Sequence, residues 1–113
     1  MTPESKLKAQ VELYLSELGY IPLRLNVFQA FTHDGIPIRT GLPKGCSDII
    51  AIQPGTGRAV FVETKVKPRK PTAEQLKFIE VMRKQGAIAG VVYSIDELKE
   101  LLNKCKINVN KYK

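Results

Sequence analysis

The sequence predicts an α/β fold in which one mixed β-sheet is flanked by helices. Two patterns carry this prediction: apolar residues recur at helical spacing in three segments, and short β-branched runs lie between them. The expected order is helix, three strands, helix, strand, helix, which is an αβββαβ core followed by a C-terminal helix. The 113 residues, 43% of them hydrophobic, suffice for a single domain, residues 1–113, with one core.

The first helix is expected to begin at Thr2 and Pro3, because threonine is a good N-cap and proline suits the first helical position. Apolar positions then recur every three or four residues, at Leu7, Val11, Tyr14, Leu15 and Leu18. Gly19 follows this run and is expected to end the helix.

Extended structure is expected over residues 20–31, where Pro22 favours a sheet edge or a strand start. Residues 32–47 carry several glycines and prolines and are expected to form a loop.

A β-hairpin is expected next. Asp48 opens the short apolar strand 49–52, and the β-rich run 59–66 follows after the turn at 54–57.

The second half of the chain alternates helix and strand signals. Thr72 and Gln75 form a capping-box signature for a helix that runs to about Gln85. Residues 88–93 indicate a buried strand, and a last amphipathic helix follows directly. The tail, about 104–113, is basic and without periodicity.

The charge balance restricts the function. Eighteen Lys and Arg against eleven Asp and Glu give a net charge of +7 and a pI near 9.5. A domain this basic is expected to bind a polyanion, although a basic surface can also serve solubility alone. No apolar run approaches the roughly 20 residues that span a bilayer, so we expect no membrane partner. One His and two distant Cys cannot form a four-ligand zinc site, and they favour a reduced, cytoplasmic chain.

The alternation of strand 59–66 places a carboxylate and an ammonium on one face. Successive side chains point to opposite faces, so Glu63 and Lys65 share the face of Phe61. Burying such charges is costly unless they pair or bind an ion. Asp48 directly precedes an apolar strand, so its carboxylate also needs a partner or an ion. The hairpin would bring Asp48 near Glu63.

The first helix supplies a third acid. Glu4 projects within about 40° of the centre of the apolar stripe, whereas Glu12 lies more than about 100° away. We therefore expect Glu4 to face the sheet. The alternative remains that Glu4, in the first helical turn, faces water and is favoured there by the helix dipole.

Three carboxylates beside a lysine suit a Mg²⁺ or Mn²⁺ ion that keeps open water positions. Such an ion can activate a water molecule and neutralise charge at a scissile phosphate. Lys65 would position that water, help deprotonate it or stabilise the phosphate oxygens. By spacing alone, an acid-x-Lys triplet is a weak signal, because a surface ion pair explains most such triplets.

A set of motifs occurs in a defined order along the chain: Gly41-Leu-Pro-Lys-Gly-Cys-Ser-Asp48-Ile-Ile-Ala-Ile52, then Val60-Phe-Val-Glu63-Thr-Lys65, then Gln75 and Gly86. This order resembles the virus-type replication-repair nuclease (VRR-NUC) family of the PD-(D/E)xK nuclease superfamily. The resemblance extends from Glu4 to about Leu102, and Ser47 stands where the superfamily pattern has proline. It implies a restriction-endonuclease-like fold.

The resemblance also implies roles for individual residues. Asp48 and Glu63 match the metal-binding carboxylates, and Lys65 matches the catalytic lysine. Glu4 matches the acid of the N-terminal helix, a further metal ligand, and Gln75 matches the glutamine that opens the helix after the metal-binding strand. For Gln75 the capping box is an alternative explanation.

The activity that this resemblance implies is a Mg²⁺- or Mn²⁺-dependent, structure-specific DNA endonuclease. Short single-domain members resemble Holliday-junction resolvases, which act as homodimers on four-way junctions, and symmetric cuts need two sites related by a two-fold axis. Three alternatives remain: a flap or single-strand nuclease, a restriction-type DNase, and a non-catalytic module that binds DNA junctions.

Basic residues near the expected site are the candidate DNA contacts. Lys67, Arg69 and Lys70 lie between the second hairpin strand and the next helix, and are expected to hold phosphates unless they form a solvated loop. Arg39 and Lys44, before Asp48, are candidates of second rank. The lone His33 is expected to be polar loop surface rather than a catalytic base.

Overall fold

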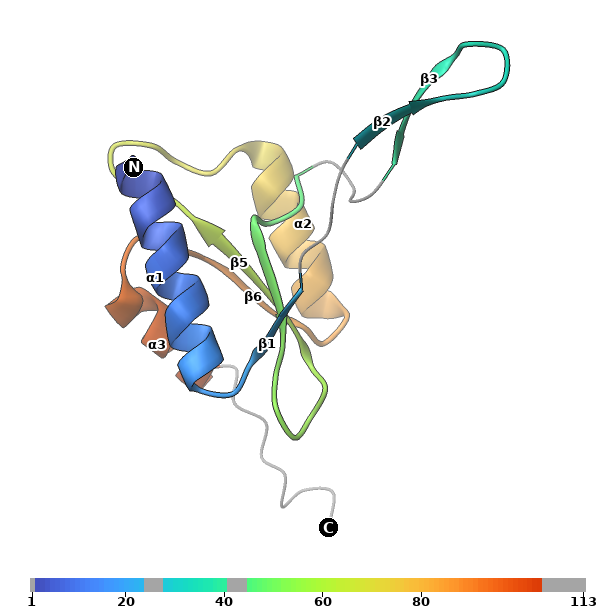
Figure 1. Ribbon diagram of the computed structural model, residues 1–113. Helices are drawn as coiled ribbons and strands as arrows, with labels where there is room; N and C mark the ends of the chain where they lie inside the picture. Colours follow the sequence, from blue (N-terminus) through green and yellow to red (C-terminus); the bar gives the residue numbers. More distant parts are fainter. Residues whose placement is uncertain (1, 24–27, 41–44, 105–113) are drawn as a thin grey trace.

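A computed structural model describes residues 2–23, 28–40 and 45–104, which form three helices and six strands (Figure 1). The elements are α1 (Pro3–Glu17), β1 (Ile21–Leu23), β2 (Phe28–Phe31), β3 (Pro37–Thr40), β4 (Ile49–Ile52), β5 (Ala59–Thr64), α2 (Ala73–Lys84), β6 (Ile88–Val92) and α3 (Ile95–Lys104).

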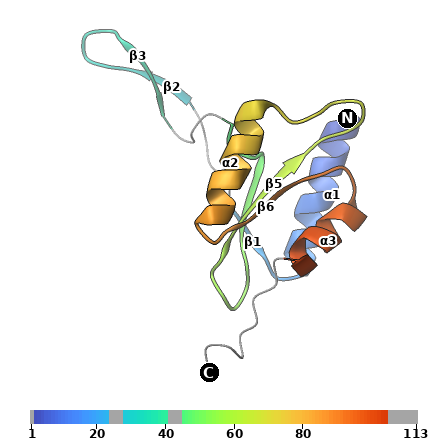
Figure 2. The same ribbon diagram turned by 180° about the vertical axis from the view of Figure 1, so that it is seen from behind.

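The described strands form a four-stranded mixed sheet in the order β1-β4-β5-β6, and a separate β2–β3 ribbon. β4 runs antiparallel to both β1 and β5, whereas β6 runs parallel to β5. α1 and α3 pack on one side of this sheet and contact each other, and α2 packs against β5 and β6 on the other (Figures 1 and 2). The predicted α/β class is confirmed, with β1, β4 and β5 as the three strands of the αβββαβ core.

The core lies between the sheet and α1 and α3. Val11 and Leu15 of α1, Val62 of β5 and Leu98 of α3 are fully buried in one cluster. The opposite face of β5 is covered by α2, where the rings of Phe61 and Phe78 meet edge to face with 5.3 Å between centroids. Strand alternation therefore buries both faces of β5.

The caps of the helices agree with the sequence signals. Thr72 and Gln75 form the predicted capping box at the start of α2, with each side chain bonded to the other residue's backbone N–H. Thr2 caps α1 by accepting a hydrogen bond from the Ser5 N–H. None of the described helices has the length and apolar character needed to cross a membrane.

The expectation of a loop over residues 32–47 was wrong in part. Pro37–Thr40 is a strand, β3, that pairs antiparallel with β2. Thr32 closes the tip, because its N–H donates to the Ile36 carbonyl and its carbonyl accepts from Gly35, whose φ of 82° is readily available to glycine. The expected extended run 20–31 is correspondingly divided between β1 and β2, which belong to different sheets.

The β2–β3 hairpin projects from the body of the molecule (Figures 1 and 2). Among the described elements, β2 and β3 contact only each other. Phe31 and Ile36 near its tip are exposed. The hairpin therefore contributes little to the core that positions the other strands.

Removing a core side chain tests this packing. We expect Leu15→Ala, at a position with 0% exposure, to lower the free energy of unfolding by about 2–5 kcal/mol, because it leaves a cavity under α1. Leu76→Ala, at an exposed position of α2, should change it by less than about 0.5 kcal/mol. Urea unfolding followed by circular dichroism measures both, and equal effects would contradict the assigned core.

Candidate active site

Asp48 and Glu63 meet at one end of the β4–β5 hairpin. Ile49 pairs with Val62, so the next pair along the ladder is Asp48 with Glu63. The Asp48 N–H donates to Oε2 of Glu63 at 3.2 Å. The proximity that the hairpin predicted is therefore confirmed.

The Asp48 carboxyl is held by Thr64. The Thr64 N–H donates to Oδ1 at 3.2 Å, and its hydroxyl donates to Oδ2 at 2.7 Å. Thr64 is fully buried, so this hydroxyl has a fixed partner rather than water. The sequence reasoning did not single out Thr64, although a polar residue on the apolar face of β5 was a signal for it.

Glu63 lies on the α2 side of the sheet within a set of polar contacts. Gln75 donates from Nε2 to Oε1 of Glu63 at 2.9 Å, and Lys65 Nζ lies 3.5 Å from the same oxygen. Glu63 and Lys65 are only 4% and 6% exposed. The Gln75 amide oxygen also accepts a hydrogen bond from the Thr72 N–H, so one side chain caps α2 and contacts Glu63.

Burial raises the pKa of both acids. For Glu63 the main cause is desolvation, followed by the negative charge of Asp48, and Lys65 offsets part of this. The Asp48 residue is exposed as a whole, but its carboxyl lies against Thr64, and desolvation raises its pKa while the Thr64 bonds and Lys8 lower it. A cation bound by both carboxyls would stabilise their charged forms and offset this repulsion.

The two acids of α1 lie in different surroundings. Glu4 accepts an ion-paired hydrogen bond from Arg69 at 2.9 Å, and both side chains are partly exposed. Glu12 instead lines a cleft with Asp48. Among the described residues no group of three His, Cys, Asp or Glu side chains is arranged to hold a metal ion. The structure therefore brings Asp48 and Glu63 together but leaves Glu4 paired with Arg69.

Ser47, at the position of the superfamily proline, is buried. Its Oγ has no hydrogen-bond partner among the described residues. Proline at this position would leave no unpaired buried hydroxyl.

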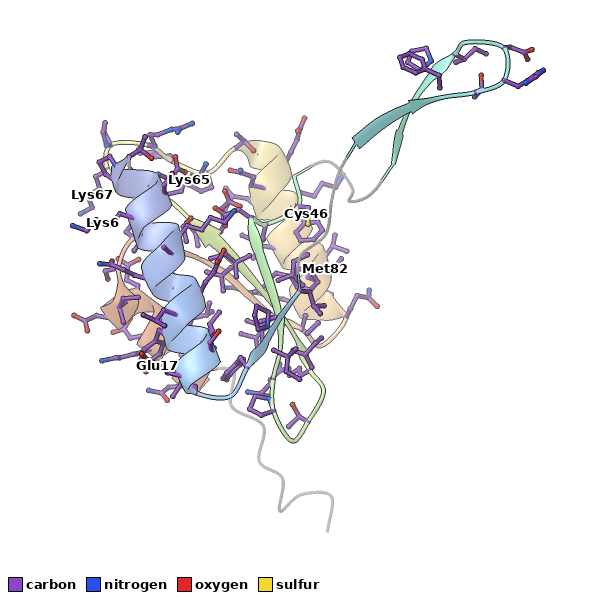
Figure 3. The ribbon with its side chains drawn as sticks, viewed as in Figure 1. Lys6, Glu17, Cys46, Lys65, Lys67 and Met82 are labelled. Atoms are coloured by element: carbon purple, nitrogen blue, oxygen red, sulfur yellow. The ribbon has the colours of Figure 1, made fainter. Side chains whose placement is uncertain are left out.

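The candidate DNA contacts lie mainly on the segment between β5 and α2. Lys67 and Lys70 are exposed, and Figure 3 places Lys67 near the N-terminal end of α1, with Lys65 at the same end of the molecule. The Arg69 carbonyl accepts a hydrogen bond from the Tyr93 hydroxyl at 2.8 Å, which anchors the segment.

Other sequence candidates fall on or near the hairpin. Arg39 belongs to β3, and its side chain is outside the described part of the structure. Lys44 lies outside the described residues. His33 is exposed in the turn between β2 and β3, and this hairpin lies away from β5 (Figure 1).

Comparisons with known proteins bear on this geometry. No family model and no curated protein matches the sequence. A solved structure described as a VRR_NUC domain matches the fold with a TM-score of 0.65 and 26% identity, over 91% of this chain and 97% of that chain. The chain resembles this VRR_NUC domain over nearly its whole length, which supports membership of the VRR-NUC family. Its mixed sheet between helices is accordingly the restriction-endonuclease-like fold of the PD-(D/E)xK type.

The donor set of the candidate site fits a divalent cation. Mg²⁺ binds oxygen ligands, often only one or two carboxylates, and completes its shell with water and substrate phosphate. Asp48 and Glu63 supply two such carboxylates on adjacent strands, and their mutual repulsion would be relieved by a cation.

The buried lysine provides a test of this electrostatic picture. We expect Lys65→Met to raise the pKa of Glu63 further, because the variant removes the cation that favours its charged form. Since the folded-state pKa then lies further above its ordinary value, the variant should lose more stability than the wild type as pH rises through that range. NMR titration of the Glu63 carboxyl carbon measures the shift. Lys67→Met, at an exposed position two residues away, should leave it unchanged; a similar shift there would contradict the assignment.

Proposed function

We propose that this chain is a Mg²⁺- or Mn²⁺-dependent endonuclease that hydrolyses the phosphodiester backbone of DNA, with Asp48, Glu63 and Lys65 at its centre. The observation that carries the proposal is the end of the β4–β5 hairpin. There, in a VRR-NUC fold, two carboxyls with raised pKa lie beside a buried lysine.

Asp48 and Glu63 would hold the metal ion. The hydrogen bond from Thr64 orients the Asp48 carboxylate, and the hydrogen bond from Gln75 orients that of Glu63. When bound, the ion lowers the pKa of a water molecule and neutralises charge on the scissile phosphate. Lys65 would place its ammonium against that water or a phosphate oxygen. Gln75 thus acts by fixing the Glu63 carboxylate.

Glu4 would join the site as a further acid only when Arg69 releases it. Their ion pair is partly exposed, and exposed pairs of this kind contribute little free energy. A DNA phosphate would compete with Glu4 for the Arg69 guanidinium. DNA binding and the release of Glu4 toward the metal would then be coupled.

We propose branched DNA as the substrate, most specifically the four-way junction cut by a homodimer. The net charge of +7 supports a polyanionic partner, and paired cuts on a symmetric junction need two equivalent sites. A flap, single-strand or restriction-type nuclease differs in substrate alone. A non-catalytic junction-binding module is less favoured, because Asp48, Glu63 and Lys65 are all retained and brought together.

The decisive experiment compares the wild type with Asp48→Ala on labelled four-way junction, flap, nicked and plain duplex DNA. We expect cutting with Mg²⁺ or Mn²⁺ and none with EDTA, and a loss of at least about a hundredfold in Asp48→Ala while junction binding persists. Binding without cutting would favour the junction-binding module. Cutting that survives Asp48→Ala would place the active site elsewhere, and site-specific cutting of plain duplex would contradict junction resolution.

The basic segment before α2 predicts the salt dependence of binding. Neutralising Lys67, Arg69 and Lys70 to glutamine should reduce the slope of log Kd against log salt by about 2–3, because about three phosphate contacts are lost. The matched control neutralises three exposed lysines of α2 and α3, Lys84, Lys99 and Lys104. Equal slopes for the two triple variants would remove the segment from the DNA-binding surface.

A further inference from the structure

A cleft that begins at Asp48 extends beyond the proposed catalytic centre. It has a volume of about 550 Å³ and lies between α1 on one side and strands β1 and β4 on the other. Its polar lining includes Lys8, Glu12 and Asp48, and its apolar lining includes Leu13 and Leu23. Pockets that bind small ligands usually have volumes of about 300–1,000 Å³, so this cleft is large enough for a small ligand such as a nucleotide.

We propose that this cleft holds one nucleotide of the cut DNA strand, with its phosphate on Lys8. The inference rests on the proposed nuclease function and adds a strand-binding site on the α1 side of Asp48. Three features support it: the polar row on α1, the half-buried Lys8 ammonium, and the exposed apolar lining.

The polar row follows from helix geometry. Lys8, Glu12 and Ser16 are each four residues apart, so they lie one above another on a single face of α1 and all line the cleft. A cation, a carboxylate and a hydroxyl along one wall offer contacts to a phosphate, to the amino group of a base and to a sugar or phosphate oxygen.

Lys8 is half-buried and lines the cleft together with Asp48. Among the described residues no carboxylate lies within ion-pair distance of its ammonium. Its positive charge lowers the pKa of Asp48, against the larger effect of desolvation. A half-buried ammonium without an ion-pair partner is well suited to receive an anion, and phosphate is the anion that DNA supplies beside the metal-binding carboxylates.

The cleft also has apolar lining residues, and two of them are open to solvent. Leu13 of α1 is 61% exposed and Leu23 of β1 is 41% exposed, and Pro22 and the buried Ile50 complete the apolar lining. A base or sugar seated there would cover apolar surface that the chain itself leaves bare. A cation beside an apolar wall matches a nucleotide better than it matches an apolar protein segment.

Equilibrium binding tests the proposal without requiring cleavage. We expect Lys8→Gln to weaken binding of a fluorescent four-way junction in EDTA about three- to tenfold and to reduce the salt slope by about 1. Leu13→Ser should weaken binding severalfold with an unchanged slope, because it removes an apolar contact and no charge. Lys6→Gln, an exposed lysine one half-turn away on α1 that lines no part of this cleft, is the matched control and should change affinity by less than twofold (Figure 3).

The outcomes separate this proposal from the function on which it rests. Wild-type affinity and slope in Lys8→Gln would overturn the nucleotide site and leave the nuclease proposal standing. Slower cutting by Lys8→Gln with unchanged binding would also overturn it, since Lys8 would then act only through the charge of Asp48. A changed oligomeric state of Leu13→Ser in sedimentation would assign the cleft to a contact between copies instead. Failure of the wild type to bind any DNA would reject the proposed function itself.

Discussion

The buried contact between Glu63 and Lys65 is the constraint on which the candidate site depends. Their charges are removed from water at the end of a strand whose other residues form the core. Each therefore needs fixed partners. Glu63 has three: the Asp48 N–H just before β4, the Lys65 ammonium just after β5, and the Gln75 amide of α2. Breaking any one contact would leave a desolvated charge less well satisfied, so the hairpin end and α2 are held in one arrangement.

Much of this arrangement followed from sequence, because the patterns involved are local or joined by a short turn. Helical spacing predicted α1, α2 and α3, and the turn at 54–57 implied that Asp48 and Glu63 would meet. Contacts between elements that are far apart in the sequence were harder to predict. Whether Glu4 or Glu12 approaches Asp48 depends on how α1 sits over the sheet, and the helical wheel cannot supply that position. The β2–β3 pairing was also missed, because its strand 37–40 lies in a run dominated by turn-forming residues.

Gln75 shows how one side chain can satisfy a local and a tertiary requirement. Its amide oxygen completes the capping box of α2, while its nitrogen binds Glu63. The cap fixes the first turn of the helix, so the nitrogen is presented to the carboxylate with little freedom left to lose. Support of this kind, from rigid helix backbone to a buried acid, is what a precise metal site requires. Capping and catalysis were alternatives in the sequence, but the structure makes them compatible.

The β2–β3 hairpin has a consequence for how this fold can diversify. Strands β1 and β4 are direct neighbours in the sheet, so the whole chain between them is one long connection between paired strands. The entropy of closing such a connection grows only with the logarithm of its length. Since β2 and β3 contact no other described element, insertions or deletions there would cost the core little. The connection can therefore vary rapidly among relatives and carry new partner preferences, while the register that joins Asp48 to Glu63 stays under constraint.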